Sequence, residues 1–148
     1  MSTYTQILYH LVFATKDRVP ALSDARREDL FMYMNGVIKN SHCRPIWISG
    51  ARDHVHILTS LHPTAALAEL VKGIKVATSI WIKENAVFPN FAGWQEGYGA
   101  FTHSLQDEPD LIAYVKGQET HHRRVTFEEE YRKLLVEAGI KVDERYFP

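Results

Sequence analysis

The sequence predicts an α+β fold, in which a ferredoxin-like βαββαβ arrangement forms one antiparallel sheet and two further helices follow at the C-terminus. Three observations lead to this fold class. Segments rich in β-branched and aromatic residues alternate with segments whose apolar residues recur at helical spacing. A glycine-containing turn joins the second and third predicted strands as a hairpin. After the fourth predicted strand, only helical patterns follow.

The first predicted strand covers residues 4–14, and a short loop separates it from the first helix. Alternate residues of a strand point to opposite faces. One face of this strand consists of Ile7, Tyr9, Leu11 and Phe13, and the other of Gln6, Leu8, His10 and Val12. Ser23 belongs to a residue type that is typical of N-caps. The apolar spacing after it predicts a helix that ends near Asn40.

Two more strands are predicted at residues 44–49 and 53–60, with Gly50 in the turn between them. We interpret this turn as a tight hairpin, in which glycine takes the backbone conformation that other residues avoid. A second helix is expected to begin at Pro63 and Thr64, with Thr64 as the candidate cap. Its apolar stripe consists of Leu67, Leu70, Val71, Ile74 and Trp81.

The fourth strand is predicted at residues 98–104, and two helices follow it. The first of them extends over about residues 107–122, with Pro109 in its first turn. The last helix covers about residues 127–138 and ends at Gly139. The two helices that connect the strands should cover one face of the sheet. The other face is then available for a functional site or for the C-terminal helices.

The composition is that of a soluble globular protein, and the length of 148 residues suits one domain spanning residues 1–148. No apolar run approaches the roughly 20 residues that a membrane-spanning helix needs. The N-terminus also lacks the pattern of a secretory signal. Cys43 is the single cysteine, which excludes an internal disulfide and a multi-cysteine zinc site. We therefore expect a cytoplasmic protein that does not associate with membranes.

A pair of histidines on the third predicted strand is the first candidate for chemistry. His54 and His56 flank Val55, so both imidazoles point to one face of the sheet while Val55 points to the other. Two neutral imidazoles side by side suit a divalent metal ion. The same pattern also fits two partly exposed strand histidines that bind nothing.

The second candidate lies on the first C-terminal helix, where Tyr114 and Gln118 are four positions apart and share a face. Taken alone, this spacing also fits an amphipathic helix with a core tyrosine and a solvated glutamine. A phenol is a poor nucleophile at neutral pH, because the reference pKa of tyrosine is about 10. A metal ion held by two imidazoles and an amide oxygen would neutralise a phosphodiester under attack by the phenol.

These two groups resemble the motifs of the single-tyrosine transposases of the HUH endonuclease superfamily. That family includes the transposases of the smallest bacterial insertion sequences and relatives associated with repetitive palindromes. His54 and His56 match its His-hydrophobic-His pair, and Tyr114-x-x-x-Gln118 matches its nucleophile and third metal ligand. Further stretches that are similar to the family are YHLVFATKDR, IKVATSIWIKEN, WQEGYGAFTHS, QETHHRRVTFEEE and VDERYFP. The resemblance covers nearly the whole chain.

The resemblance implies a DNA transposase that cleaves and religates single-stranded DNA. Tyr114, on the first C-terminal helix, would attack a DNA phosphate and form a 5′-phosphotyrosine link with a free 3′-OH. His54, His56 and Gln118 would bind Mg²⁺ or Mn²⁺ and complete the catalytic site. The implied partners are DNA hairpins at the ends of an element. A second copy of the chain is also implied, in a homodimer whose active sites are shared between the subunits.

DNA contacts outside the catalytic site are predicted at Lys72, Lys75, Arg123 and Arg124. The formal net charge of −1 argues against nucleic-acid binding by the usual electrostatic footprint, so a local basic stripe must supply the phosphate contacts. Solvated lysines and a favourable interaction with a helix C-terminus are the alternatives for these residues. Trp47, Trp81 and Trp94 are candidates for stacking on bases, although Trp81 also fits the core.

Six further residues receive an interpretation from the sequence. Asp53 either orients His54 or belongs to the turn before it. His10 is interpreted as a buried structural histidine on the same face as His54. Residues 128–130, three glutamates, are interpreted as the solvated first turn of the last helix. Gly117 lies inside a predicted helix, where glycine costs about 1 kcal/mol relative to alanine, and is interpreted as tolerated.

Two other functions fit parts of the pattern. A domesticated relative would bind hairpin DNA or RNA without cutting it. A metal-dependent phosphoesterase acting on small molecules would use the histidines but would not need Tyr114. Because all the residues that the DNA-cleavage chemistry requires are present, we expect an active enzyme.

Overall fold

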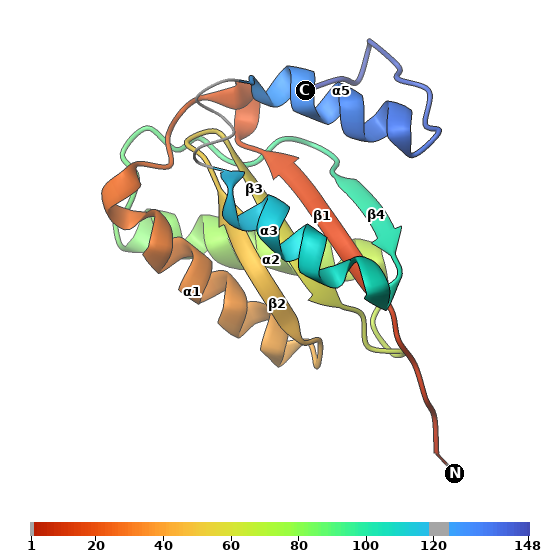
Figure 1. Ribbon diagram of the computed structural model, residues 1–148. Helices are drawn as coiled ribbons and strands as arrows, with labels where there is room; N and C mark the ends of the chain where they lie inside the picture. Colours follow the sequence, from red (N-terminus) through yellow and green to blue (C-terminus); the bar gives the residue numbers. More distant parts are fainter. Residues whose placement is uncertain (1, 119–124) are drawn as a thin grey trace.

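Four antiparallel strands form the centre of the molecule in the computed structural model, which describes residues 2–118 and 125–148. The strands are β1 (Leu8–Ala14), β2 (Pro45–Gly50), β3 (His54–Ser60) and β4 (Gly99–His103). Their order in the sheet is β2-β3-β1-β4, so β1 and β3 are the two central strands (Figure 1). This order separates β1 from β2 and β3 from β4 by one strand each, as a split βαβ arrangement requires.

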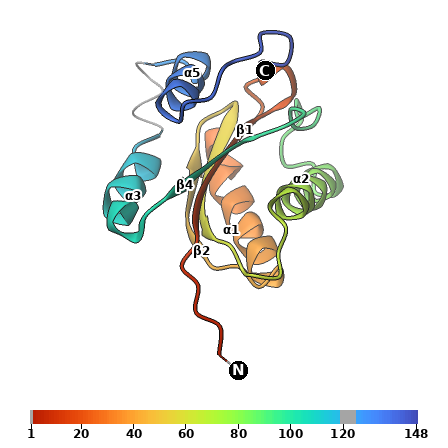
Figure 2. The same ribbon diagram turned by 90° about the vertical axis from the view of Figure 1, so that its right-hand side faces the viewer.

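The helices are divided between the two faces of the sheet. The helices α1 (Asp24–Asn40) and α2 (Leu67–Glu84) cover one face, whereas α3 (Glu108–Lys116) and α5 (Phe127–Glu137) lie on the other (Figure 2). The predicted α+β fold class is therefore confirmed. None of the helices in the described part of the chain is long and apolar enough to cross a membrane.

The main core lies between the sheet and the helices α1 and α2. The alternation of the strands explains this position, because Leu11, Phe13, Val55 and Ile57 all point to the helix-covered face and are buried there. On the opposite face, a second apolar cluster joins the sheet to α5 through Val12, Ala14, Phe101, Phe127 and Tyr131. The predicted faces of the first strand are thus confirmed, and α5 is anchored by its own apolar stripe.

Two predicted element starts are wrong. Strand β1 begins at Leu8 rather than at residue 4, because β3 and β4 both end opposite Leu8 at Ser60 and His103. Tyr4 lies outside the sheet and is 91% exposed. Helix α2 begins at Leu67, and Thr64 is not its cap. Instead, the Thr64 hydroxyl hydrogen-bonds to Nδ1 of His62 at 2.7 Å.

The end of α3 also differs from the prediction. Pro109 lies in the first turn as expected, but the helix ends at Lys116, and Gly117 is its C-cap with φ −81° and ψ 5°. The predicted continuation to residue 122 is therefore interrupted at Gly117, and its residues 119–122 lie outside the described residues. Glycine has the highest backbone freedom and a low helix propensity, which favours a turn here.

The last helix agrees closely with the prediction. Helix α5 ends at Glu137, Ala138 is its C-cap, and Gly139 follows in the left-handed region with φ +73°. At its start, the Thr126 side chain accepts a hydrogen bond from the backbone N–H of Glu129, an N-cap that stabilises the first turn. The start and end of α5 are therefore both set by local interactions.

Gly50 has a different role from the one predicted for it. It is the last residue of β2 and pairs with Val55, and its φ is not positive. A Cβ at this position would overlap the backbone carbonyl oxygen of His54. Glycine is therefore required by the close approach of two backbones rather than by an unusual turn conformation.

We predict that Gly50→Ala lowers the free energy of unfolding by about 1–3 kcal/mol, the usual cost of overpacking, because the hairpin backbone must move. The control is Gly36→Ala in α1, where a Cβ has no atom within 4 Å. This control should raise the same free energy by roughly 0.5–1 kcal/mol. Urea denaturation of both variants is the measurement, and equal stability of the two would contradict the close-approach explanation.

Candidate active site

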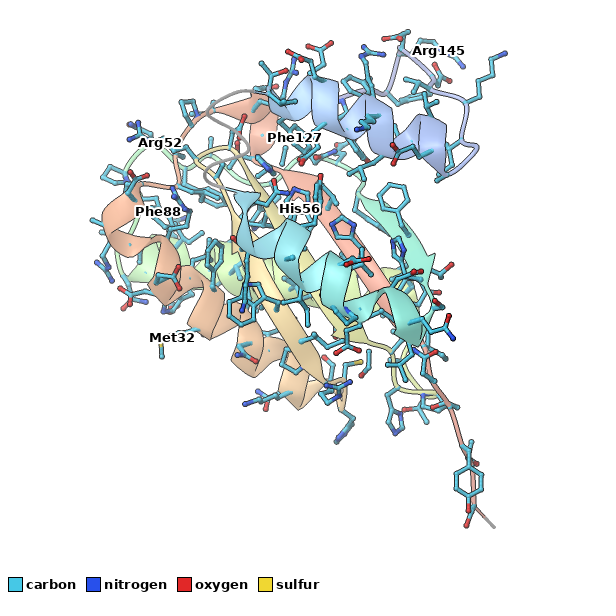
Figure 3. All side chains as sticks on the ribbon, viewed as in Figure 1. Met32, Arg52, His56, Phe88, Phe127 and Arg145 are labelled. Atoms are coloured by element: carbon cyan, nitrogen blue, oxygen red, sulfur yellow. The ribbon has the colours of Figure 1, made fainter. Side chains whose placement is uncertain are left out.

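Strand β3 presents His54 and His56 on the face opposite to the main core, and both imidazoles are buried there. Figure 3 shows His56 beside α3, with Phe127 of α5 nearby. Nδ1 of His54 donates a hydrogen bond to a carboxylate oxygen of Asp53 at 2.7 Å. In the neutral ring this leaves an electron pair on Nε2, directed into the protein. The predicted orienting contact between Asp53 and His54 is thus present.

The ring of His56 is held by His10 from the neighbouring strand β1. Nε2 of His10 and Nδ1 of His56 share a hydrogen bond of 2.7 Å. Burial lowers the pKa of His10 well below its usual range, and the neighbouring His56 and His103 lower it further. His10 is therefore a buried neutral histidine on the same face, as expected, and it fixes the orientation of His56.

Gln118 reaches the histidines from the turn that follows α3. Its Oε1 lies 3.5 Å from Nε2 of His54, and its amide nitrogen donates to the backbone carbonyl of Tyr114 at 3.4 Å. This second contact orients the amide so that the oxygen faces the imidazole. Tyr114 and Gln118 thus meet the histidine pair, although Gly117 interrupts the helix that was expected to carry both.

Tyr114 projects from α3 toward the same cluster. Its ring lies edge-on to His56, with centroids 5.8 Å apart, and its hydroxyl donates a short hydrogen bond to Oε2 of Glu130. Burial raises the pKa of the Tyr114 phenol well above its ordinary value, and the contact with the Glu130 carboxylate raises it further. The phenol is therefore protonated at neutral pH and needs a proton acceptor before it can act as a nucleophile.

Glu130 is the residue that the sequence interpretation missed. The expectation of a solvated first turn is wrong for this glutamate, which is only 3% exposed. Its Oε1 lies 3.0 Å from Nε2 of His56 and 3.7 Å from Nε2 of His54. Helical periodicity is the signal that identifies it, because Glu130 shares the apolar face of α5 with Phe127 and Tyr131. By contrast, Glu129 is exposed as expected.

The donor atoms of this cluster fit a divalent cation. His54, His56 and Glu130 each offer one ligand atom, and these atoms lie within 4.8 Å of one another. The amide oxygen of Gln118 adds a further oxygen beside His54. Imidazole nitrogens held by neighbouring polar groups, together with oxygen ligands, suit first-row divalent metals. All these groups are buried, and the phenol of Tyr114 lies beside them.

The comparisons with known proteins concern the family and the fold of the chain. A family model described as "Transposase IS200 like" matches residues 3–118, most of the chain, including both the histidine pair and Tyr114. The chain belongs to the IS200-like transposase family. No curated protein matches it at a significant level.

Two solved structures are similar to this transposase in fold. The first is a protein from Deinococcus radiodurans assigned as a transposase, with 22% identity and a TM-score of 0.62; the match covers 80% of this chain and 96% of that one. The second is a REP-associated tyrosine transposase bound to a REP hairpin, with 14% identity and a TM-score of 0.61. That match covers 100% of this chain and 89% of that one.

Two of the four residues predicted to contact DNA outside the catalytic site lie in the described part of the transposase. Lys72 and Lys75 are on α2, which covers the sheet face opposite to the histidines (Figure 2). Nζ of Lys75 donates to the backbone carbonyls of Gln95 and Gly97 at 2.8 and 2.5 Å, and burial lowers its pKa. Lys72 is exposed. Arg123 and Arg124 lie outside the described residues, and DNA contact by these four stays a prediction.

The three tryptophans have different surroundings. Trp94 is buried, and its Nε1 donates to the Thr78 hydroxyl at 2.9 Å. Trp81 stacks on Tyr33 beside the core. Trp47 is the most exposed, and the Lys116 ammonium lies 4.1 Å from its ring centroid. Of the three, Trp47 is therefore the one that could offer a ring face to a base.

The contacts of Lys75 lead to a prediction that separates a structural role from DNA binding. Lys75→Met should lower the free energy of unfolding by about 1–3 kcal/mol, because two carbonyl groups lose their donor. The exposed control Lys72→Met should change it by less than about 0.5 kcal/mol. Both values come from urea denaturation. Unchanged stability of Lys75→Met, together with weaker binding of single-stranded DNA, would instead assign Lys75 to the DNA interface.

Proposed function

We propose that this transposase cleaves and rejoins single-stranded DNA through a 5′-phosphotyrosine link on Tyr114, with a divalent cation held by His54, His56 and Gln118. One observation carries the proposal: the phenol of Tyr114 lies in the same buried cluster as the two imidazoles and the amide oxygen. A cation bound there would neutralise the charge of the scissile phosphate, and Mg²⁺ or Mn²⁺ suits this ligand set.

The residues of the chain divide the work of the cleavage step. Tyr114 forms the new bond to phosphorus, and the bond from phosphorus to the 3′ oxygen breaks. The phenol proton passes to Glu130, whose Oε2 already accepts the hydrogen bond of the hydroxyl. The leaving 3′ oxygen takes a proton from water. Asp53 and His10 keep His54 and His56 in the required orientations.

Rejoining is the reverse of this step. The phosphotyrosine link keeps the phosphodiester's energy, so the 3′-OH of another strand can attack it without a nucleotide cofactor. The attacking 3′-OH gives its proton to water, and Tyr114 leaves as the phenolate and recovers its proton from Glu130, its hydrogen-bond partner. Strand transfer therefore needs only the residues that cleavage uses.

Hairpin DNA is the proposed substrate, since a structure of similar fold, that of a REP-associated tyrosine transposase, contains a REP hairpin. Tyr114 lies beside the histidines of its own chain, which supports a site assembled within one subunit. A homodimer remains part of the proposal, and in it an exchange of α3 would bring Tyr114 to the same place beside the histidines of the second copy. The presence of Tyr114 within the cluster favours cleavage over hairpin binding alone and over a small-molecule phosphoesterase.

We predict that the wild-type protein forms a covalent adduct with labelled single-stranded DNA hairpins in the presence of Mn²⁺, and that Tyr114→Phe does not. The adduct is detected on a denaturing gel. Tyr33→Phe is the matched control, because Tyr33 lies on α1 against Trp81, and it should leave the adduct unchanged. An adduct in Tyr114→Phe would refute Tyr114 as the nucleophile. Cleavage by the wild-type protein without an adduct would indicate hydrolysis by water. Tight hairpin binding by the wild-type protein without cleavage would indicate a domesticated relative.

The double variant His54→Ala/His56→Ala should lose DNA cleavage while keeping the fold, since the imidazoles contribute ligands rather than the main core. The matched control is His42→Ala/His62→Ala, a second neighbouring pair whose ring centroids are 6.0 Å apart and which is not part of the candidate metal cluster. Cleavage is measured with excess Mn²⁺, and the fold by circular dichroism. Full activity of the His54/His56 variant would be incompatible with the proposed metal site.

A further inference from the structure

Glu130 lies beyond the segment that the family model matches, which ends at residue 118. It nevertheless occupies the centre of the candidate site, because the apolar residues Phe127 and Tyr131 anchor α5 against the sheet. Phe127 also stacks on the His54 ring, with centroids 4.6 Å apart. The docking of α5 thus delivers a carboxylate to the histidine pair.

The two oxygens of Glu130 have different neighbours. Oε2 accepts the hydrogen bond from the Tyr114 hydroxyl, whereas Oε1 faces Nε2 of both His54 and His56. A buried carboxylate is costly unless opposite charge or hydrogen bonds compensate for it. The hydrogen bond at Oε2 contributes to this compensation, and a cation between the imidazoles would add to it at Oε1.

The positions of the ring nitrogens support a cation at this point. Because Nδ1 of His54 donates to Asp53, Nε2 of the neutral ring directs an electron pair toward Gln118 Oε1 and Glu130 Oε1. The ligand atoms that His54, His56 and Glu130 offer lie within 4.8 Å of one another, so one cation can contact all three. His10, a neutral ring, can accept the Nδ1 proton of His56 and so leave Nε2 of His56 available as a ligand.

We infer that Glu130 is a fourth, anionic ligand of the cation in this site through Oε1, while its Oε2 holds the phenol of Tyr114. The inference rests on the proposed function, because it concerns the same metal site. It adds a negative charge to a ligand set that is otherwise neutral. The same side chain then contacts both the nucleophile and the cation. The docking of α5 is therefore required for metal binding as well as for the position of Tyr114.

The test is a titration of the full-length protein with MnCl₂ by isothermal calorimetry, without DNA. Glu130→Gln should weaken Mn²⁺ binding by at least about tenfold. A loss of this size is typical even when the mutated residue only hydrogen-bonds to a metal ligand. The control Glu129→Gln changes the exposed neighbour on the same turn and should bind as the wild type does. If Glu130→Gln does not fold, Glu130→Asp is measured instead. The shorter side chain moves the carboxylate away from the imidazoles, so this variant should also bind Mn²⁺ more weakly than the wild type.

A carboxylate that merely fills the site and leaves when a cation enters would give the opposite result. Mn²⁺ affinity would then be unchanged or higher in Glu130→Gln, and the inference would be overturned. His56→Ala separates this failure from that of the proposed function. Loss of Mn²⁺ binding in His56→Ala but not in Glu130→Gln would refute only the role of Glu130 as the fourth ligand. If both variants bind Mn²⁺ as the wild type does, the proposed metal site itself is refuted.

Discussion

The alternation of side chains along β3 is the constraint on which the rest of the structure depends. Val55 and Ile57 point into the main core under α1 and α2, so His54 and His56 must point to the opposite face. That face is covered as well, and buried polar rings require partners. The groups around the imidazoles meet this requirement. A one-residue change of register would exchange the two faces and destroy core and site together.

The candidate site is assembled from segments that are far apart along the chain. The central strands contribute the imidazoles, the end of α3 contributes Tyr114 and Gln118, and α5 contributes Glu130. His54 and His56 lie on the central strand β3, whereas Tyr114 and Gln118 are separated by the turn at Gly117. In the proposed strand transfer, His54 and His56 would stay in place on the sheet while Tyr114 is covalently loaded and released.

Most of the fold could be predicted because its patterns are local. Period-two alternation identified the strands, helical spacing identified the helices, and Gly139 marked the end of α5. The errors occur at ends that distant segments determine. The start of β1 depends on where its neighbours β3 and β4 end, and no local pattern contains that information. Gly50 was identified as essential for the wrong reason, because the backbone it must approach belongs to the next strand.

By itself, the sequence determined the fold class and the shared face of His54 and His56, since both follow from the spacing of residues within single elements. The family resemblance predicted that Tyr114 and Gln118 would join them. Only the tertiary structure decided that Glu130 is buried and Lys75 half-buried. Glu130 lies in a run of glutamates and Lys75 on an amphipathic helix, where both look like surface residues. Glu130 is covered because α5 docks on the sheet, and Lys75 because the loop before β4 folds over α2. Such contacts depend on packing between segments that are distant in sequence, so no local pattern contains them.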